Sequence, residues 1–185
     1  MRLEKKGIRV LGLAESFRSE NSDKSVLAGV VMRRDGIIDG AVFGSATIKG
    51  DDATEAMLKM YDKLSRNDIN VIMLGGTIIS LYNIVDVKDL QRVTGVPSIG
   101  VSFNESAGLE ESLRMHFAKG WRKKIAAYRR LGNREAINLK TGYEVFVRPV
   151  GLTTDAARLV LDAFTLQGSV PEPIRVAKIL ARSRL

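Results

Sequence analysis

Acidic residues follow two apolar stretches of this sequence, and their side chains are of the type that holds metal ions. Glu15 comes directly after the apolar run Ile8 to Ala14, and Asp51 and Asp52 follow a longer run. Carboxylates gathered at one edge of a sheet can bind Mg²⁺, which activates water and stabilises charge on a cleaved phosphate. If both acidic segments reach one edge, Glu15 and Asp52 are candidate catalytic residues and metal ligands.

Further oxygen-bearing side chains extend this candidate metal site. Asp51 is a second acid beside Asp52, Asp86 could add a carboxylate from the start of a later helix, and Asn83 could add a neutral oxygen. Simpler roles are open for the same residues. Asp52 and Asp86 both stand where helix N-cap residues stand, and Glu15 could be a solvated loop residue. The candidate metal ligands are therefore Glu15, Asp51, Asp52 and Asp86.

A basic tract interleaved with aromatic residues is the second chemical feature. Basic side chains pair with phosphates and aromatic rings stack on bases, so such a tract is typical of nucleic-acid binding. A helix that packs Trp121, Ile125 and Tyr128 inward and points its charges outward fits the same spacing. The candidate nucleic-acid-binding residues are Lys119, Trp121, Arg122, Lys123, Lys124, Arg129 and Arg130.

Several other chemistries are not expected. The single histidine, His116, falls on a helix with Leu113 and Phe117, which favours a structural role, and Ser16 has no histidine near it for a serine triad. The absence of cysteine excludes disulfides and thiolate metal sites. Gly75-Gly76-Thr77 lacks the lysine of a phosphate-binding Walker loop, which favours a tight turn.

Composition indicates an ordinary globular protein with excess positive charge. The 185 residues are 45% apolar and 27% charged, which predicts one domain over residues 1–185. No run has the character of a secretory signal or a membrane span, so we expect a cytoplasmic protein with no membrane partner. The net charge of +8 fits a phosphate-bearing partner, and it also fits general solubility.

The order of elements predicts how the acidic residues are positioned. The strand candidates are 7–14, 26–34, 37–49, 69–74 and 98–103. Asp35-Gly36 is a hairpin turn signal between the second and third of them. Helices that begin near Asp52 and Asp86 separate the later strands. Three antiparallel strands followed by helix-linked parallel strands give a ribonuclease-H-like α/β fold, with a mixed five-stranded sheet and helices on both faces.

The second half of the sequence predicts more helix. Helices are expected over 108–117 and 120–131, and a small hairpin is expected over 135–147. Two further C-terminal helices begin near Thr153 and Pro171. In the first of them the apolar stripe consists of Ala157, Val160, Leu161 and Phe164.

Four segments resemble a known archaeal family in order and spacing. They are Ile8-Arg9-Val10-Leu11-Gly12, Gly50-Asp51-Asp52-Ala53-Thr54, Tyr82-Asn83-Ile84-Val85-Asp86 and Gly95-Val96-Pro97-Ser98-Ile99-Gly100-Val101. The chain resembles, over essentially its whole length, the family catalogued as domain of unknown function ninety-nine, which is itself similar to endonuclease V. The resemblance to endonuclease V covers the first 103 residues. It implies a ribonuclease-H-like fold and an Mg²⁺- or Mn²⁺-dependent endonuclease acting on modified or deaminated DNA or RNA.

The same resemblance implies three acids, of which this chain retains one. The first acid of endonuclease V falls at Ala14, with Glu15 one position later, and the third falls at Gly75. The second falls where Asp51 and Asp52 stand, and the Pro-Tyr wedge that endonuclease V places beside the damaged base is missing before them. The sequence therefore also allows a nucleic-acid-binding protein that has kept the fold and lost catalysis. In either case Ala14 and Gly75 should lie side by side.

Overall fold

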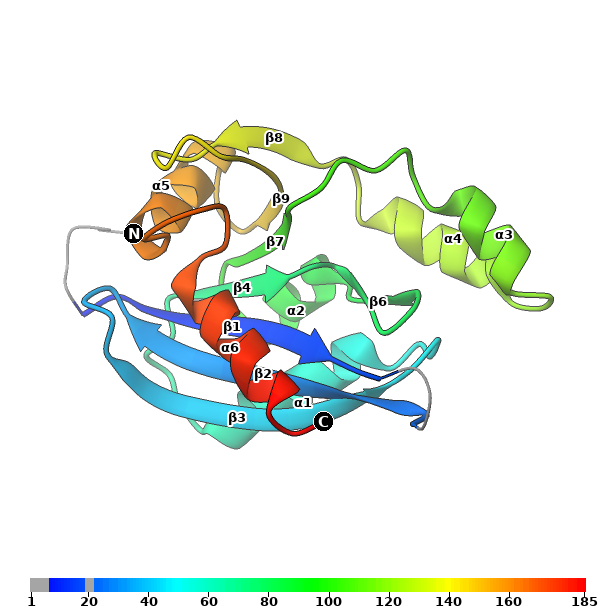
Figure 1. Cartoon of the computed structure of the whole chain (residues 1–185), viewed down its shortest axis with the longest axis horizontal. Helices are drawn as coiled ribbons and strands as arrows, with labels where there is room; N and C mark the ends of the chain where they lie inside the picture. Colours follow the sequence, from blue (N-terminus) through cyan, green and yellow to red (C-terminus); the bar gives the residue numbers. More distant parts are fainter. Residues whose placement is uncertain (1–6, 19–21) are drawn as a thin grey trace.

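The computed structural model describes residues 7–18 and 22–185. The described residues form a sheet of seven strands with helices on both of its faces (Figure 1). The strands of this sheet are β1 (Arg9–Ser16), β2 (Lys24–Arg33), β3 (Ile38–Thr47), β4 (Val71–Gly75), β7 (Ser98–Ser102), β8 (Glu135–Asn138) and β9 (Glu144–Val150). The helices are α1 (Ala53–Leu64), α2 (Val87–Thr94), α3 (Glu110–His116), α4 (Trp121–Arg130), α5 (Thr154–Phe164) and α6 (Glu172–Arg182).

The strand order confirms the predicted ribonuclease-H-like half of the sheet. Strands β3, β2 and β1 are antiparallel neighbours, and β1, β4 and β7 are parallel neighbours. Leu13 of β1 pairs with Leu74 of β4, so the carboxyl ends of these two strands meet at one edge. A separate two-stranded hairpin, β5 (Ile78–Ile79) and β6 (Asn83–Ile84), follows β4 at this edge.

The predicted number of strands was wrong, because the second hairpin is part of the sheet. Strand β9 pairs antiparallel with β7, and β8 pairs with β9, which extends five strands to seven. The reason is burial: Val145 and Val147 have no exposed surface and belong to the core between the sheet and α5. A hairpin outside the sheet would leave these side chains in water.

Helices cover the two faces of the sheet, as predicted. Leu11 and Leu13 point to the face covered by α1 and α2, whereas Val10 and Ala14 point to the face covered by α5 and α6. This alternation follows from the two-residue period of a strand. The predicted apolar stripe of α5 is buried in the core between the sheet and helices α5 and α6. The stripe consists of Ala157, Val160, Leu161 and Phe164.

Helix α6 lies directly on β1 (Figure 1). A Cβ atom added at Gly12 would lie 2.3 Å from the carbonyl carbon of Pro173, so only glycine allows this approach. Ala14 and Gly75 lie side by side under the same helix, as predicted. A Cβ atom added at Gly75 would lie 3.8 Å from the Cβ of Ala14 and 2.7 Å from Cγ2 of Ile174.

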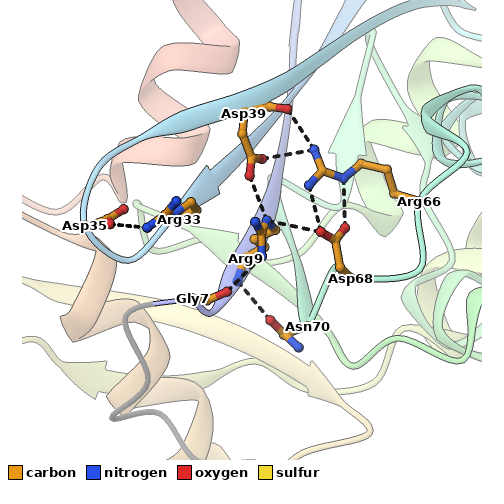
Figure 2. Close-up of polar contacts among 8 residues, drawn as sticks. All are labelled: Gly7, Arg9, Arg33, Asp35, Asp39, Arg66, Asp68 and Asn70. Carbon is orange, nitrogen blue, oxygen red and sulfur yellow. Dashed lines mark hydrogen bonds and ion pairs between the residues drawn. The ribbon is translucent and has the colours of Figure 1, made fainter.

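A network of ion pairs ties the amino-terminal edge of β1 to its surroundings (Figure 2). Arg9 donates to Asp39 at 2.7 Å, and Arg66 donates to Asp39 and also to both oxygens of Asp68. The main-chain N–H of Arg9 donates to Asn70 at 2.9 Å. These contacts join β1, β3 and the segment before β4, at the edge opposite the candidate acids.

Helices α3 and α4 form a pair on the side to which β1 and β4 point (Figure 1). Within the described residues, no helix combines the length and the apolar character needed to cross a membrane.

Candidate functional site

Glu15 is held in place at the carboxyl end of β1. Its Oε1 accepts from the main-chain N–H of Ser80 at 2.9 Å, and its Oε2 accepts from the Ser80 hydroxyl at 2.6 Å. The Ser80 hydroxyl also lies 2.6 Å from that of Ser25. Lys178 of α6 donates to the main-chain carbonyl of Glu15 at 2.6 Å. Glu15 is half-buried and fixed by both carboxylate oxygens, so it is not a solvated loop residue.

Asp52 stands at the N-cap position of α1, but its side chain does not cap the helix. Its carboxylate accepts from the N–H and hydroxyl of Thr47, at 2.9 and 2.7 Å, and from Nδ2 of Asn83 at 2.7 Å. Oδ1 of the buried Asn83 accepts from the Ala53 N–H at 3.1 Å and takes over the capping role. Burial raises the pKa of Asp52, but the hydrogen bonds from Thr47 and Asn83 outweigh it and lower the pKa overall.

Asp51 is an ion-pair partner of α4. Its carboxylate accepts from Lys123 at 2.9 Å and from Lys124 at 2.7 Å. The Lys124 ammonium also donates to the carbonyls of Gly50 and Tyr82, at 2.7 and 3.1 Å, so all three of its donors are used. Burial raises the pKa of Asp51, but the hydrogen bonds and charges of the two lysines outweigh it and lower the pKa below its usual value. The Lys124 side chain is only 7% exposed and ties α4 to the sheet edge.

Asp86 caps α2, as the capping alternative predicted. Its Oδ1 accepts from the N–H groups of Lys88 and Asp89, at 3.1 and 3.3 Å. Its Oδ2 lies 3.6 Å from Nε of Arg130. Both oxygens of this acid therefore have partners within the protein.

The hairpin of β5 and β6 connects Glu15 and Asp52, the two central acids of the site. It carries Ser80, which binds Glu15, and Asn83, which binds Asp52. Between its strands, Ser80, Leu81 and Tyr82 all have positive φ angles, of 47°, 51° and 75°. Sequence reasoning named Asn83 but not Ser80, because the segment Ile-Ser-Leu carries no turn signal.

The candidate carboxylates lie in separate hydrogen-bond and ion-pair networks. Within residues 7–18 and 22–185, no three His, Cys, Asp or Glu side chains come close enough together to hold a metal ion. Glu15 and Asp52 bind neutral donors, and Asp51 binds two lysines. This donor set fits a hydrogen-bonded network rather than a two-metal site, which needs several converging oxygen ligands.

The basic tract has mixed surroundings. The Arg122 guanidinium lies 4.7 Å from the ring centroid of Trp121, and Arg129 pairs with Glu110 at 2.8 Å. Lys119 is exposed between α3 and α4. Together with the pairs that Lys123, Lys124 and Arg130 make, four of the six cations of the tract already face a carboxylate.

Two hollows with volumes of about 750 and 270 Å³ share part of their lining, and the smaller lies beside the carboxyl ends of β4 and β7. The smaller is lined by Gly76, Thr77 and Ser102, which follow β4 or end β7. Sequence reasoning missed this region, because its basic residues come from β9 and from the loop before β8, whose place in the sheet was not predicted. The residues that line both hollows are Ser106, Tyr128, Arg134 and Arg148.

Comparison with known proteins gives one family over nearly the whole chain. The model of the family described as endonuclease dU matches residues 6–184. A UPF0215 protein of Pyrobaculum calidifontis is 39% identical over 172 residues, which cover 92% of this chain and 93% of that protein.

Solved structures show the same fold. A protein of unknown function from Archaeoglobus fulgidus superposes with a TM-score of 0.82 at 23% identity, over 96% of this chain and 98% of that one. Endonuclease V of Ciona intestinalis, in complex with DNA containing an inosine followed by a ribo-adenosine, gives a TM-score of 0.62 at 16% identity, over 97% and 86% of the two chains. The likeness to endonuclease V places the sheet in the ribonuclease-H-like class.

Proposed function

The chain belongs to the endonuclease dU family, and we propose that it is an endonuclease acting on nucleic acid that carries deaminated bases, with deoxyuridine as the first candidate. The family match carries this proposal, because it spans residues 6–184 and so includes both central acids and every strand of the sheet. The fold supports the proposal, since endonuclease V of Ciona intestinalis has the same fold and its structure contains bound DNA with an inosine.

Glu15 is the carboxylate that we assign to the reaction. It lies at the carboxyl end of β1, the kind of edge at which ligands bind in open α/β sheets. A carboxylate has about four lone-pair sites, and Ser80 uses one on each oxygen. The remaining capacity can accept a proton from a water molecule that attacks the phosphate. Ser80 fixes the direction of the acid before the substrate arrives.

Asp52 has a positioning role in this proposal. It binds Asn83, and Asn83 belongs to the hairpin that also carries Ser80. Asp52 therefore holds the hairpin that holds Glu15. Dependence on Mg²⁺ or Mn²⁺ remains a prediction from the resemblance to endonuclease V, with Asp51 and Asp86 as further candidate ligands.

A cleavage assay tests the proposal. Labelled single- and double-stranded DNA with one uracil, one hypoxanthine or neither is incubated with Mg²⁺, Mn²⁺ or EDTA. We expect cleavage of the uracil strand, and a loss of about 100-fold or more in Glu15→Gln, because removing a general base typically costs that much. Glu144→Gln, a change at an exposed acid on β9, should cut like the wild type.

Two outcomes would count against the proposal. Equal cleavage by the wild type and Glu15→Gln would remove Glu15 from the reaction. Absence of cleavage on every strand, in RNA as well as DNA, would remove the endonuclease.

A binding protein without catalysis is the second candidate function. Two observations favour it: within the described residues no three acidic or histidine side chains could hold a metal ion, and Ala14 and Gly75, which stand at two of the three positions where the resemblance to endonuclease V implies acids, lie side by side. If the protein only binds nucleic acid, it should bind the same strands in EDTA and release them intact. The cleavage assay separates the two candidates directly.

A further inference from the structure

The two hollows share a buried arginine that forms no ion pair with a carboxylate in the described part of the chain. Arg148 of β9 is 7% exposed. Its Nε donates to the carbonyl of Gly132 at 3.0 Å, its Nη1 donates to the hydroxyl of Thr77 at 3.1 Å, and the Tyr128 side chain is a further partner. All of these partners are neutral. Buried charges in proteins are normally paired, because an uncompensated charge is costly to remove from water.

A second arginine lines the same two hollows. Arg134 donates to the carbonyls of Asn104 and Ser106, at 3.0 and 3.4 Å, and its guanidinium lies 4.9 Å from the ring centroid of Phe146. Across the described part of the chain, no ion pair joins either arginine to a carboxylate. Burial lowers the pKa of Arg148, and the charge of Arg134 lowers it too, yet an arginine stays protonated near pH 7.

Among the described residues that line the hollows, Glu105 is the only acid. Glu105 is exposed and lines the larger hollow but not the smaller one, and it forms no ion pair with either guanidinium. The hollows therefore present two positive charges. Within the described residues, the groups that contact them are carbonyls, hydroxyls and aromatic rings. By contrast, the cations of α4 are largely paired, Lys124 with Asp51 and Arg129 with Glu110. Within the described residues, Lys119 and Arg122 of the basic tract also face no carboxylate, but both are exposed, whereas Arg148 in the hollows is buried.

The two hollows, which share Arg134 and Arg148, are together called the cavity. We propose that the cavity binds a backbone phosphate of the nucleic-acid strand, with Arg148 and Arg134 as the residues that contact it. The planar fork of a guanidinium matches phosphate oxygens with two parallel hydrogen bonds. The rings of Tyr128 and Phe146 line the larger hollow, where a neighbouring base or sugar can contact them. Its volume of about 750 Å³ lies within the range of about 300–1,000 Å³ typical of ligand pockets.

The position of the cavity relates it to the proposed reaction, on which this inference rests. Thr77, which binds Arg148, and Ser80, which binds Glu15, belong to the same short segment after β4. A strand with one phosphate on Arg148 would therefore run along the carboxyl ends of β4 and β1 toward Glu15. The cavity fixes the strand, and the carboxylate acts on a different phosphodiester.

Binding measurements with single-residue variants test the cavity. A fluorescein-labelled single strand of 15 nucleotides is titrated in EDTA, and its anisotropy is followed over a series of salt concentrations. We expect Arg134→Gln and Arg148→Lys to weaken binding about ten-fold, and Arg134→Gln to reduce the salt slope by about one phosphate contact. Arg148→Lys keeps the charge and loses the planar fork, and thermal melting checks that each variant folds.

Arg92→Gln is the matched control, because Arg92 is an exposed arginine that pairs with Asp89 on α2. It removes the same charge as Arg134→Gln and should bind within about two-fold of the wild type, since exposed pairs contribute little. Glu105→Gln should tighten binding, because it removes a negative charge beside the cavity.

Four results decide between the alternatives. Equal weakening in Arg92→Gln and Arg134→Gln would overturn the cavity as a phosphate site, even if the wild type cuts DNA. If deoxyuridine monophosphate competes at a concentration equal to that of the strand, the cavity is a site for a free nucleotide, and the proposed contact with a strand phosphate is overturned. Competition by inorganic phosphate only at far higher concentration supports the strand. Binding that depends on Arg148, in a protein that cuts nothing, would uphold the cavity while the proposed endonuclease fails.

Discussion

At the residue scale, Lys124 is a buried contact on which the junction between α4 and the sheet edge depends. Replacing it with Met keeps the apolar stem and leaves two main-chain carbonyls, of Gly50 and Tyr82, without this donor. Unsatisfied buried groups cost about 1–3 kcal/mol, and we expect a loss of that order in urea denaturation. Lys123→Met should change stability by less than about 0.5 kcal/mol, because Lys123 is 77% exposed. Equal losses would contradict the role of burial.

Gly75 offers a second test at the same scale. Gly75→Ala places a methyl group 2.7 Å from Cγ2 of Ile174, and overpacking of this kind costs about 1–3 kcal/mol. Ile174→Leu removes that Cγ2 atom while keeping the volume. The double variant should therefore be more stable than the sum of the two single changes predicts, as measured in a double-mutant cycle. Strict additivity would show that the two side chains do not meet.

What the sequence could predict at this scale depends on how far away the partner of a residue lies. Asp86 was identified as a possible cap, and its partners are two and three positions later. For Asp52 the capping alternative is not realised, because its carboxylate binds Thr47 and Asn83, and Asn83 lies 31 positions away. Arg148 was not considered, because its burial depends on the pairing of β9 with β7. The proposed roles of Glu15 and of the basic tract remain predictions.

At the scale of elements, the hairpin of β5 and β6 contains strained backbone. Leu81 has a φ of 51° and is 40% exposed, so the left-handed conformation is costly there and little packing offsets it. Asn tolerates the left-handed conformation better than Leu, so Leu81→Asn should raise stability by about 0.5–1 kcal/mol. The same change at Leu159, an exposed residue within α5, should lower stability by a few tenths of a kcal/mol, because Asn is a weaker helix former. Thermal melting compares the two. A loss at Leu81 would show that its side chain is needed at the turn.

The elements of the first half were predictable from local signals. The hairpin turn at Asp35-Gly36 and the change from a strand period to a helix period near Asp52 give the order of β2, β3 and α1. The valines of β9 predicted a strand equally well, but a strand pattern does not name its neighbour in the sheet. Five strands instead of seven were predicted for this reason.

At the scale of the whole molecule, the ion-pair network of Figure 2 predicts a change of stability with pH. Burial raises the pKa of Asp39, but Arg9 and Arg66 lower it overall, and the hydrogen bond from Arg66 is the main cause of the lowered pKa of Asp68. A carboxyl with a lowered pKa in the folded protein stabilises the fold above its unfolded pKa of about 4. This contribution is lost as the pH falls through the folded-state pKa.

Asp39→Asn removes part of this contribution. We expect the variant to be less stable than the wild type by about 1 kcal/mol at pH 7, given partial solvent screening. The difference should shrink as urea denaturation is repeated from pH 5 to pH 2. A difference that does not change over this range would show that the charge of Asp39 does not stabilise the fold.

The net charge of +8 leads to a prediction about the whole surface. Nucleic-acid affinity should fall more than about ten-fold between 50 and 200 mM salt, because each neutralised phosphate of a single strand adds about −0.7 to the logarithmic slope. A titration series in EDTA measures it. An affinity independent of salt would argue against contact with the phosphate backbone.

The contact of α6 with β1 has a consequence for how the protein is made. Strand β2 ends at Arg33 and α6 begins at Glu172, so about 140 residues are synthesised between the first hairpin and the helix that covers it. At roughly 5–20 residues per second this takes on the order of ten seconds. During that interval one face of β1 and β2 has no cover from α6 on the ribosome. This face is therefore where we expect a chaperone to bind the nascent chain, and where two unfinished chains would aggregate.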